Sequence, residues 1–353
     1  MKPLTLITCI LCSLGSSVAI ASPNSFRDPL DTPAVNAFAP ASQSLLAAAR
    51  AGATPIAVGM RGLIVASEDG GASWEQRPTP VQSDLTSVSF PDAQHGWAAG
   101  HDGVILQTND GGRSWNRQLD GRMAAERFTA HYATRIAQGE EKLGPLLAEL
   151  KRNYQAGPSL PWLDICFEDA NQGYAVGPFG SIARTDDGGK TWLPAMERID
   201  NPDLLNLNAI RGIAGELYIA AERGTVFRLD RAQQRFLRAG TGYAGSFFGI
   251  AGDARALVAY GLRGTVFRSS DGGATWSRST TPTPVAVTAG AALPDGRIVL
   301  ATLGGMIWIG EGDMARFVSL APGVTDAFTA VTALDARRLL LAGLRGAHVK
   351  KLP

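Results

Sequence analysis

The stretch Ser67-Glu68-Asp69-Gly70-Gly71-Ala72-Ser73-Trp74 decides the fold, because its pattern occurs four times in the chain. The other copies span residues 108–115, 185–192 and 269–276. Aspartate and hydroxyl oxygens can accept hydrogen bonds from turn amides, and the two glycines permit positive φ. We therefore interpret each copy as a β-hairpin turn with a structural aspartate and a tryptophan that anchors the next strand. These structural residues are Asp69, Trp74, Asp110, Trp115, Asp187, Trp192, Asp271 and Trp276.

The octapeptides belong to a longer repeat. Their aspartates are separated by 41, 77 and 84 residues. A second pattern, a small-apolar strand, a turn with a marker glycine and another strand, precedes each octapeptide and also occurs where the octapeptide is lost. The steps between its marker glycines are 41, 77, 44, 40, 41 and 41 residues, which gives seven units. The marker glycines are Gly62, Gly103, Gly180, Gly224, Gly264, Gly305 and Gly346.

Each unit of about 40 residues accommodates four short strands, which is typical of a β-propeller blade. We therefore predict an all-β, seven-bladed propeller over residues 41–353. The seventh unit ends soon after its third strand, at Pro353. We expect part of the N-terminal segment, residues 22–40, to supply the missing outer strand and close the ring.

The step of 77 residues between Gly103 and Gly180 is much longer than the others. It indicates a helical insert between blades two and three, at about residues 122–157. Phe128, Tyr132 and Ile136 recur every four residues, and the leucines from Leu143 to Leu150 also follow a helical period. Gly139 separates the two runs. The sequence therefore predicts a helical hairpin, which either caps the propeller or serves as an arm that contacts a partner.

The N-terminus has the pattern of a secretory signal. Lys2 precedes a short apolar run from Leu4 to Val18, and Ala19-Ile20-Ala21 fits a cleavage site. We expect residues 1–21 to be removed and the protein to be periplasmic; the alternative is an uncleaved anchor. Cys166 is then the single cysteine of the mature chain, expected to be buried and inert. With 33 basic and 32 acidic residues in the whole chain, nothing in the charge suggests a nucleic-acid partner.

Arginine is frequent in one set of turns. In a propeller, the turns between the second and third strands lie on the face opposite the octapeptides. The residue before the marker glycine in these turns is Arg in four of seven units: Arg61, Arg223, Arg263 and Arg345. Guanidinium groups suit the recognition of carboxylates or phosphates. These arginines either bind a partner or pair with acids of their own turns and neighbouring blades.

The extended unit resembles that of the photosystem II assembly and stability factors of cyanobacteria and plastids and their bacterial relatives, over about residues 40–353. The octapeptides are also similar to the Asp-box (BNR) repeat of sialidase-like proteins. The first resemblance implies a non-enzymatic periplasmic or lumenal scaffold, with an arginine-rich patch, that assists the assembly or stability of a membrane complex. It implies an exported or membrane protein as partner; we expect a monomer that does not itself span the membrane.

The residues that carry chemistry in sialidases are not evident in the sequence. Arg135-Ile136-Ala137 departs from the Arg-Ile-Pro motif of that family and lies in the helical insert. Tyr243 is the one tyrosine in a loop-like context, and Glu222 adjoins Arg223. The four histidines show no metal-ligand spacing. We expect no catalytic residue, cofactor or metal; the alternative is a sialidase-like glycoside hydrolase or a glycan-binding propeller.

Overall fold

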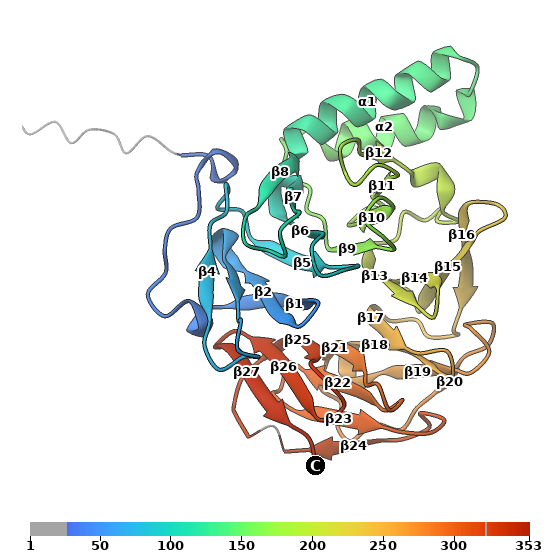
Figure 1. Cartoon of the computed structure of the whole chain (residues 1–353). Coiled ribbons are helices and arrows are strands. Elements are labelled where there is room, and N and C mark those ends of the chain that lie inside the picture. The colour runs from blue at the N-terminus through green and yellow to red at the C-terminus, as the bar shows by residue number, and fades with distance from the viewer. Residues whose placement is uncertain (1–26, 322) are drawn as a thin grey trace, which may run out of the picture.

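The structure is a computed structural model that describes residues 27–321 and 323–353, and it forms a ring of seven antiparallel sheets (Figure 1). Six sheets have four strands in sequence order and the seventh has three. The innermost strand of each blade lines the centre of the ring. The predicted fold is therefore confirmed. The predicted signal segment, residues 1–21, lies outside the described residues.

The strand bounds follow the predicted repeat. Blades one to three contain β1 (Leu45–Ala51), β2 (Thr54–Gly59), β3 (Ile64–Ala66), β4 (Glu75–Arg77), β5 (Leu85–Ser89), β6 (Gly96–Gly100), β7 (Ile105–Thr108), β8 (Asn116–Leu119), β9 (Asp164–Phe167), β10 (Gly173–Val176), β11 (Ile182–Thr185) and β12 (Leu193–Pro194). Blades four and five contain β13 (Leu207–Ile213), β14 (Glu216–Ala221), β15 (Thr225–Asp230), β16 (Arg235–Gly240), β17 (Phe247–Gly252), β18 (Leu257–Gly261), β19 (Val266–Ser269) and β20 (Ser277–Arg278). Blades six and seven contain β21 (Val287–Ala292), β22 (Ile298–Thr302), β23 (Ile307–Gly310), β24 (Phe317–Leu320), β25 (Phe328–Ala333), β26 (Arg338–Gly343) and β27 (Gly346–Lys351).

The octapeptides form the turns between the third and fourth strands, as their hydrogen bonds show in blade two. Asp110 Oδ1 accepts the backbone N–H groups of Arg113 and Ser114, both at 3.0 Å. The Ser114 hydroxyl donates to Asp110 Oδ2 at 2.6 Å. Gly112 has φ 87°, and a Cβ there would lie 2.7 Å from Ile56 Cδ1 of blade one. The turn therefore needs glycine both for its backbone and for its contact with the preceding blade.

The helical insert is confirmed as α1 (Gly121–Ala137) and α2 (Gly144–Asn153), between β8 and β9. Asp120 caps α1, since its Oδ1 accepts the Met123 N–H at 3.0 Å. Phe128, Tyr132 and Leu150 are buried in one core with blades two and three. The Tyr132 hydroxyl donates to Glu197 Oε2 at 2.8 Å and accepts the Met196 N–H at 3.0 Å. The hairpin thus covers the outer edge of blade three, beside the short strand β12 (Figure 1).

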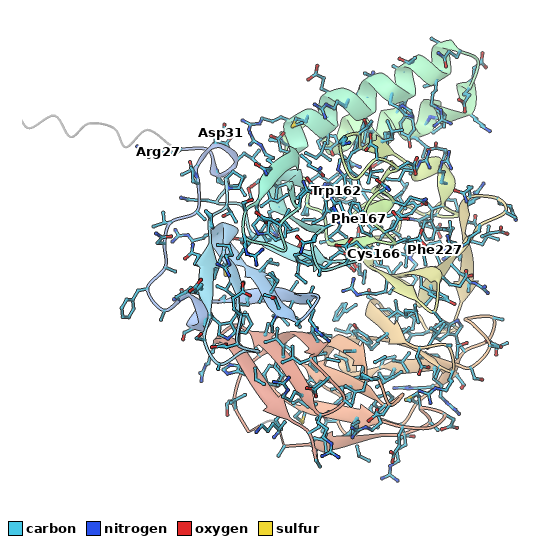
Figure 2. The ribbon with its side chains drawn as sticks, viewed as in Figure 1. Arg27, Asp31, Trp162, Cys166, Phe167 and Phe227 are labelled. Atoms are coloured by element: carbon cyan, nitrogen blue, oxygen red, sulfur yellow. The ribbon has the colours of Figure 1, made fainter. Side chains whose placement is uncertain are left out.

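The N-terminal segment takes a different place from the one expected. Leu30 is buried in the core shared by blades one and two. Backbone groups of the segment bond to the end of blade one, with Ala34 N–H donating to Thr79 O at 3.1 Å. Asp31, which Figure 2 shows at the edge of the ring, pairs at 2.8 Å with Arg122 at the start of α1.

Residues 27–40 therefore run from blade two along the outer strand of blade one toward blade seven, and they form no strand with blade seven. The closing strand that we expected from residues 22–40 is not provided by this described part, and residues 22–26 lie outside it. The ring closes through its inner strands instead. Thr329 donates to Leu45 O at 2.7 Å and Thr332 donates to Ala48 O at 2.9 Å.

Cys166 lies in β9 and is buried, as expected (Figure 2). Burial raises the pKa of its thiol to about 11, although the nearby Arg211 opposes this shift. Within the part of the chain that the structure describes, no helix is both long and apolar enough to cross a membrane.

Candidate functional site: the arginine face and the central channel

The turns between second and third strands share an unusual backbone. In five blades the residue before the marker glycine has φ between 50° and 57°: Arg61, Asp102, Phe179, Arg223 and Arg263. The glycine that follows is buried, and a Cβ on Gly62 would lie 2.0 Å from Val81 O. The tightly packed glycine fixes the turn, and the side chain before it is left at the surface.

All four predicted arginines are exposed in these turns. We call the surface formed by these turns the arginine face. Arg61 and Arg345 lie on blades one and seven, which adjoin at the ring closure. Arg223 and Arg263 lie on the adjoining blades four and five.

The nearest acids bind backbone groups rather than guanidinium groups. Asp84 Oδ1 accepts the Arg61 N–H at 2.7 Å, and the Asp326 carboxylate accepts the Arg345 N–H at 3.1 Å. Among the described residues, the guanidinium groups of Arg61, Arg263 and Arg345 have no hydrogen-bond or ion-pair partner. Arg223 lies 4.0 Å from Asp203, whose carboxylate is closer to Arg238, at 3.1 Å. The positive charges of Arg61, Arg263 and Arg345 are therefore available to an external anion, whereas Arg223 pairs weakly with Asp203.

The helical insert begins at the same face. A Cβ on Gly103, in the corresponding turn of blade two, would lie 2.8 Å from Gly121 Cα at the start of α1. Trp162, just after the insert, donates from its indole to Gly103 O at 3.1 Å. The hairpin therefore flanks blades two and three, which lie between blades one and four of the ring.

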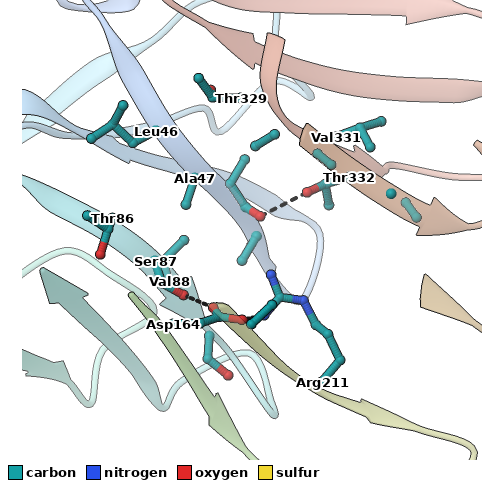
Figure 3. A pocket seen from close by; sticks show the side chains of 18 of the residues that line it. Leu46, Ala47, Thr86, Ser87, Val88, Asp164, Arg211, Thr329, Val331 and Thr332 are labelled. Atoms are coloured by element: carbon teal, nitrogen blue, oxygen red, sulfur yellow. Dashed lines mark hydrogen bonds and ion pairs between the residues drawn. The ribbon is translucent and has the colours of Figure 1, made fainter. Parts of the chain in front are cut away.

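A central channel with a cavity of about 520 Å³ runs between the inner strands (Figure 3). The described residues that line it include three charged groups: Arg50, Asp164 and Arg211. Asp164 is buried and pairs with Arg211. Its carboxylate also accepts the Ser87 hydroxyl and, at 2.7 Å, the Ile210 N–H. This carboxylate thus connects blades two, three and four.

Sequence reasoning did not identify Asp164 and Arg211. The signal was present as single charged residues inside apolar strands, in Leu163-Asp164-Ile165 and Ala209-Ile210-Arg211. Such residues have to find a partner or water when the strand is buried. The pairing of the two could not be inferred, because it depends on adjacent blades.

A sialidase site needs three converging arginines beside a tyrosine–glutamate pair. The described lining of the channel has two arginines, one tyrosine (Tyr260) and no glutamate. Tyr243 packs against Phe247 and Phe267 instead. Glu222 accepts the Asn206 N–H at 2.9 Å. No group of three or more metal-ligating side chains occurs within residues 27–321 and 323–353.

Comparison with known proteins yields a family model and solved structures. The family model described as photosynthesis system II assembly factor YCF48 matches residues 50–129. No curated protein matches the chain.

Two similar solved structures are of YCF48 itself. The structure titled "YCF48 bound to D1 peptide" is 16% identical, with a TM-score of 0.64, and the match covers 91% of this chain and 99% of that chain. YCF48 from Cyanidioschyzon merolae is also 16% identical, with a TM-score of 0.62, 90% of this chain and 97% of that chain being covered.

Other propellers share the fold more generally. The β-propeller domain of Cps50 (Swd1) from Myceliophteria thermophila is 11% identical over 88% of this chain and 97% of that chain, with a TM-score of 0.63. The general likeness to such propellers shows the ring architecture alone. The family model is thus similar to residues 50–129, and the two YCF48 structures show that the chain as a whole shares their β-propeller fold.

Proposed function

We propose that this chain is a non-enzymatic assembly factor that binds a protein partner, an exported protein or a subunit of a membrane complex, through the arginine face. The observation that carries the proposal is the set of four exposed guanidinium groups on one face, three of them without a partner among the described residues. A solved structure of YCF48, which this chain resembles over almost its full length, contains a bound peptide of D1.

Binding is favoured over glycoside hydrolysis by the arrangement of charge. The exposed arginines are spread over blades one, four, five and seven rather than gathered in one pocket. Spread guanidinium groups suit a macromolecular partner with several anionic groups, whereas a sialidase concentrates them on one carboxylate. The helical hairpin buries its apolar face mainly against blades two and three.

Partner binding can be tested with variants on the two opposite faces. The test variant removes the positive charge of the arginine face by changing four residues to Ala: Arg61, Arg223, Arg263 and Arg345. Its control, Arg113→Gln with Lys190→Gln, removes two exposed charges from the octapeptide turns on the other face. We expect affinity purification from solubilised membranes to recover partners with the wild type and the control but not with the arginine variant. Equal recovery with all three proteins would contradict docking at this face.

We further propose that the mature protein is periplasmic and begins at Ser22. The support is the charged start, the short apolar run and the Ala19-Ile20-Ala21 cleavage pattern. N-terminal sequencing of the protein recovered from the periplasmic fraction tests this. A chain that still begins at Met1 and sediments with the membranes would favour an uncleaved anchor.

A further inference from the structure

Exposed apolar side chains occupy the same turns as the arginines. Among the described residues, Met60, Leu262 and Leu344 are 46%, 42% and 49% exposed, and each directly precedes one of the arginines in the chain. Leu303 takes the same position in blade six and is 52% exposed. Blades five, six, seven and one are consecutive around the ring, so these four apolar residues form one arc.

Hydrogen bonds place this arc around the entrance of the central channel. The N–H of Leu303 donates to Ala286 O at 3.0 Å, and the N–H of Met60 donates to Ser44 O at 3.2 Å. Leu262 and Leu344 make the equivalent bonds to Ser246 and Ala327, at 3.4 and 3.3 Å. Each acceptor lies at the start of the inner strand of its blade. The four apolar residues therefore stand where the inner strands enter the channel.

The channel entrance carries apolar residues at the two ends of the same sector, in blades five and one. Every inner strand from blades one, two, four, five, six and seven has a register irregularity at its start. In blades two, four, six and seven the extra residue is polar and bonds to the next blade, as Thr288 does to Phe328 O at 2.6 Å. The extra residue is Leu46 in blade one and Phe248 in blade five, and both line the channel. Phe248 is 36% exposed.

We propose that the channel entrance, in the sector formed by blades five, six, seven and one, receives a protruding chain segment of a partner protein. This segment carries apolar side chains flanked by aspartate or glutamate. This inference rests on the proposed function and specifies the chemistry of the partner. Apolar side chains of the segment contact Met60, Leu262, Leu303, Leu344 and Phe248. Its carboxylates reach Arg61, Arg263 and Arg345, whose guanidinium groups have no acidic partner among the described residues.

The concave shape of the channel entrance favours a chain segment, rather than a membrane surface, as the occupant. A bilayer is flat and contacts only the outermost side chains, whereas Leu46 and Phe248 line a cavity of about 520 Å³. A loop or chain end can enter such a cavity and bury apolar groups on several sides at once. The combination of apolar contact and guanidinium–carboxylate pairing then gives both affinity and orientation.

The experiment uses selected peptides and three variants of the full chain. A displayed library of random peptides is selected on the wild-type protein, and the enriched peptides are measured by fluorescence polarisation. The test variants are Leu303→Ser with Leu344→Ser, and Arg61→Gln with Arg345→Gln. The control is Leu237→Ser with Val318→Ser, which changes exposed apolar residues of outer strands β16 and β24. Thermal unfolding verifies that all variants are folded.

We expect enriched peptides that combine Leu, Ile, Phe or Met with Asp or Glu. Each test variant should weaken their binding about tenfold or more, which corresponds to about 1.4 kcal/mol, and the control should bind as the wild type does. The inference is overturned by enriched peptides without acidic residues, or by unchanged binding to the leucine variant. If the wild type sediments with anionic phosphatidylglycerol vesicles and the leucine variant does not, a membrane is the occupant and the inference is also overturned.

The leucine variant and the four-arginine variant together distinguish a failure of this inference from a failure of the proposed function. If the leucine variant still recovers the membrane partner while the four-arginine variant does not, the arginine face binds the partner but the channel entrance does not receive it. If both variants recover the partner equally, the proposed function of this face fails as well.

Discussion

Asp164 is expected to be the most sensitive charged residue of the propeller, because its carboxylate joins three blades. It is 2% exposed and accepts hydrogen bonds from Ser87, Ile210 and Arg211. The change Asp164→Ala leaves the Ile210 N–H and the Ser87 hydroxyl without this acceptor. It also leaves the Arg211 guanidinium without its counter-ion.

The loss of stability caused by Asp164→Ala depends on how many of these hydrogen bonds can be replaced by water. Loss of one partner from a fully buried ion pair costs about 3–5 kcal/mol. The Arg211 side chain is 46% exposed, toward the channel, so water can solvate part of its charge. We therefore expect a loss of about 3 kcal/mol in the free energy of unfolding. With an unfolding entropy of about 2.1 cal/mol/K per residue over the 353 residues, this loss lowers Tm by about 4 °C.

Differential scanning calorimetry and urea denaturation measure this change. Asp164→Asn is the matched control for shape, since its amide keeps one acceptor oxygen but replaces the other by an NH2 group and removes the charge; a smaller decrease, about 1–2 kcal/mol, is expected. Combination of Asp164→Asn with Arg211→Met in a double-mutant cycle isolates the interaction between the two side chains. A Tm for Asp164→Ala within about 1 °C of the wild type would refute the argument that this carboxylate holds the blades together.

Three further predictions concern the turns, the insert and the cysteine. Hydrogen bonds from the hydroxyl and backbone N–H of Thr275 lower the pKa of Asp271 to about 2. Because this folded-state pKa lies below the ordinary value of about 3.9, the stability that it contributes is present above about pH 4 and is lost as the pH falls toward 2. Asp271→Asn should flatten this part of a Tm-against-pH curve, and an unchanged slope would contradict the assignment. Tyr132→Phe removes the hydroxyl that joins α1 to Glu197 and Met196, and should lower the free energy of unfolding by about 1–2 kcal/mol in urea; no change would contradict a contribution of this hydroxyl to stability. The Cys166 thiol, buried and with its pKa raised to about 11, should not react with a disulfide reagent near neutral pH until denaturant is added, and a fast reaction of the native protein would count against its burial.

The repeat was predictable because its determinants are local. The octapeptide turn is held by hydrogen bonds within a few residues, such as those from Arg113 and Ser114 to Asp110. Its copies therefore reveal the period of the blades directly. The helices of the insert were predictable for a similar reason, since the apolar residues of one helical face are three or four positions apart. The arginine positions followed from the same register, and the structure places all four in the expected turns.

Other features depended on contacts between distant parts of the chain. The segment at residues 27–40 has no regular alternation, so its position was decided by contacts with blade one and with Arg122, which is 91 residues from Asp31. Asp164 and Arg211 are 47 residues apart and meet only because adjacent blades align their inner strands.

The sequence by itself determined the number of blades, their strands, the helical insert and the face on which the arginines lie, because each depends on hydrogen bonds and periodicity within one repeat. Only the tertiary structure decided that the arginines of blades one, five and seven have no partner among the described residues, since Asp84 and Asp326 bind backbone N–H groups instead. It also decided which apolar residues remain exposed. Met60, Leu262, Leu303 and Leu344 follow strands whose apolar residues are buried; their turns leave them exposed, and the closed ring places these four turns in one arc.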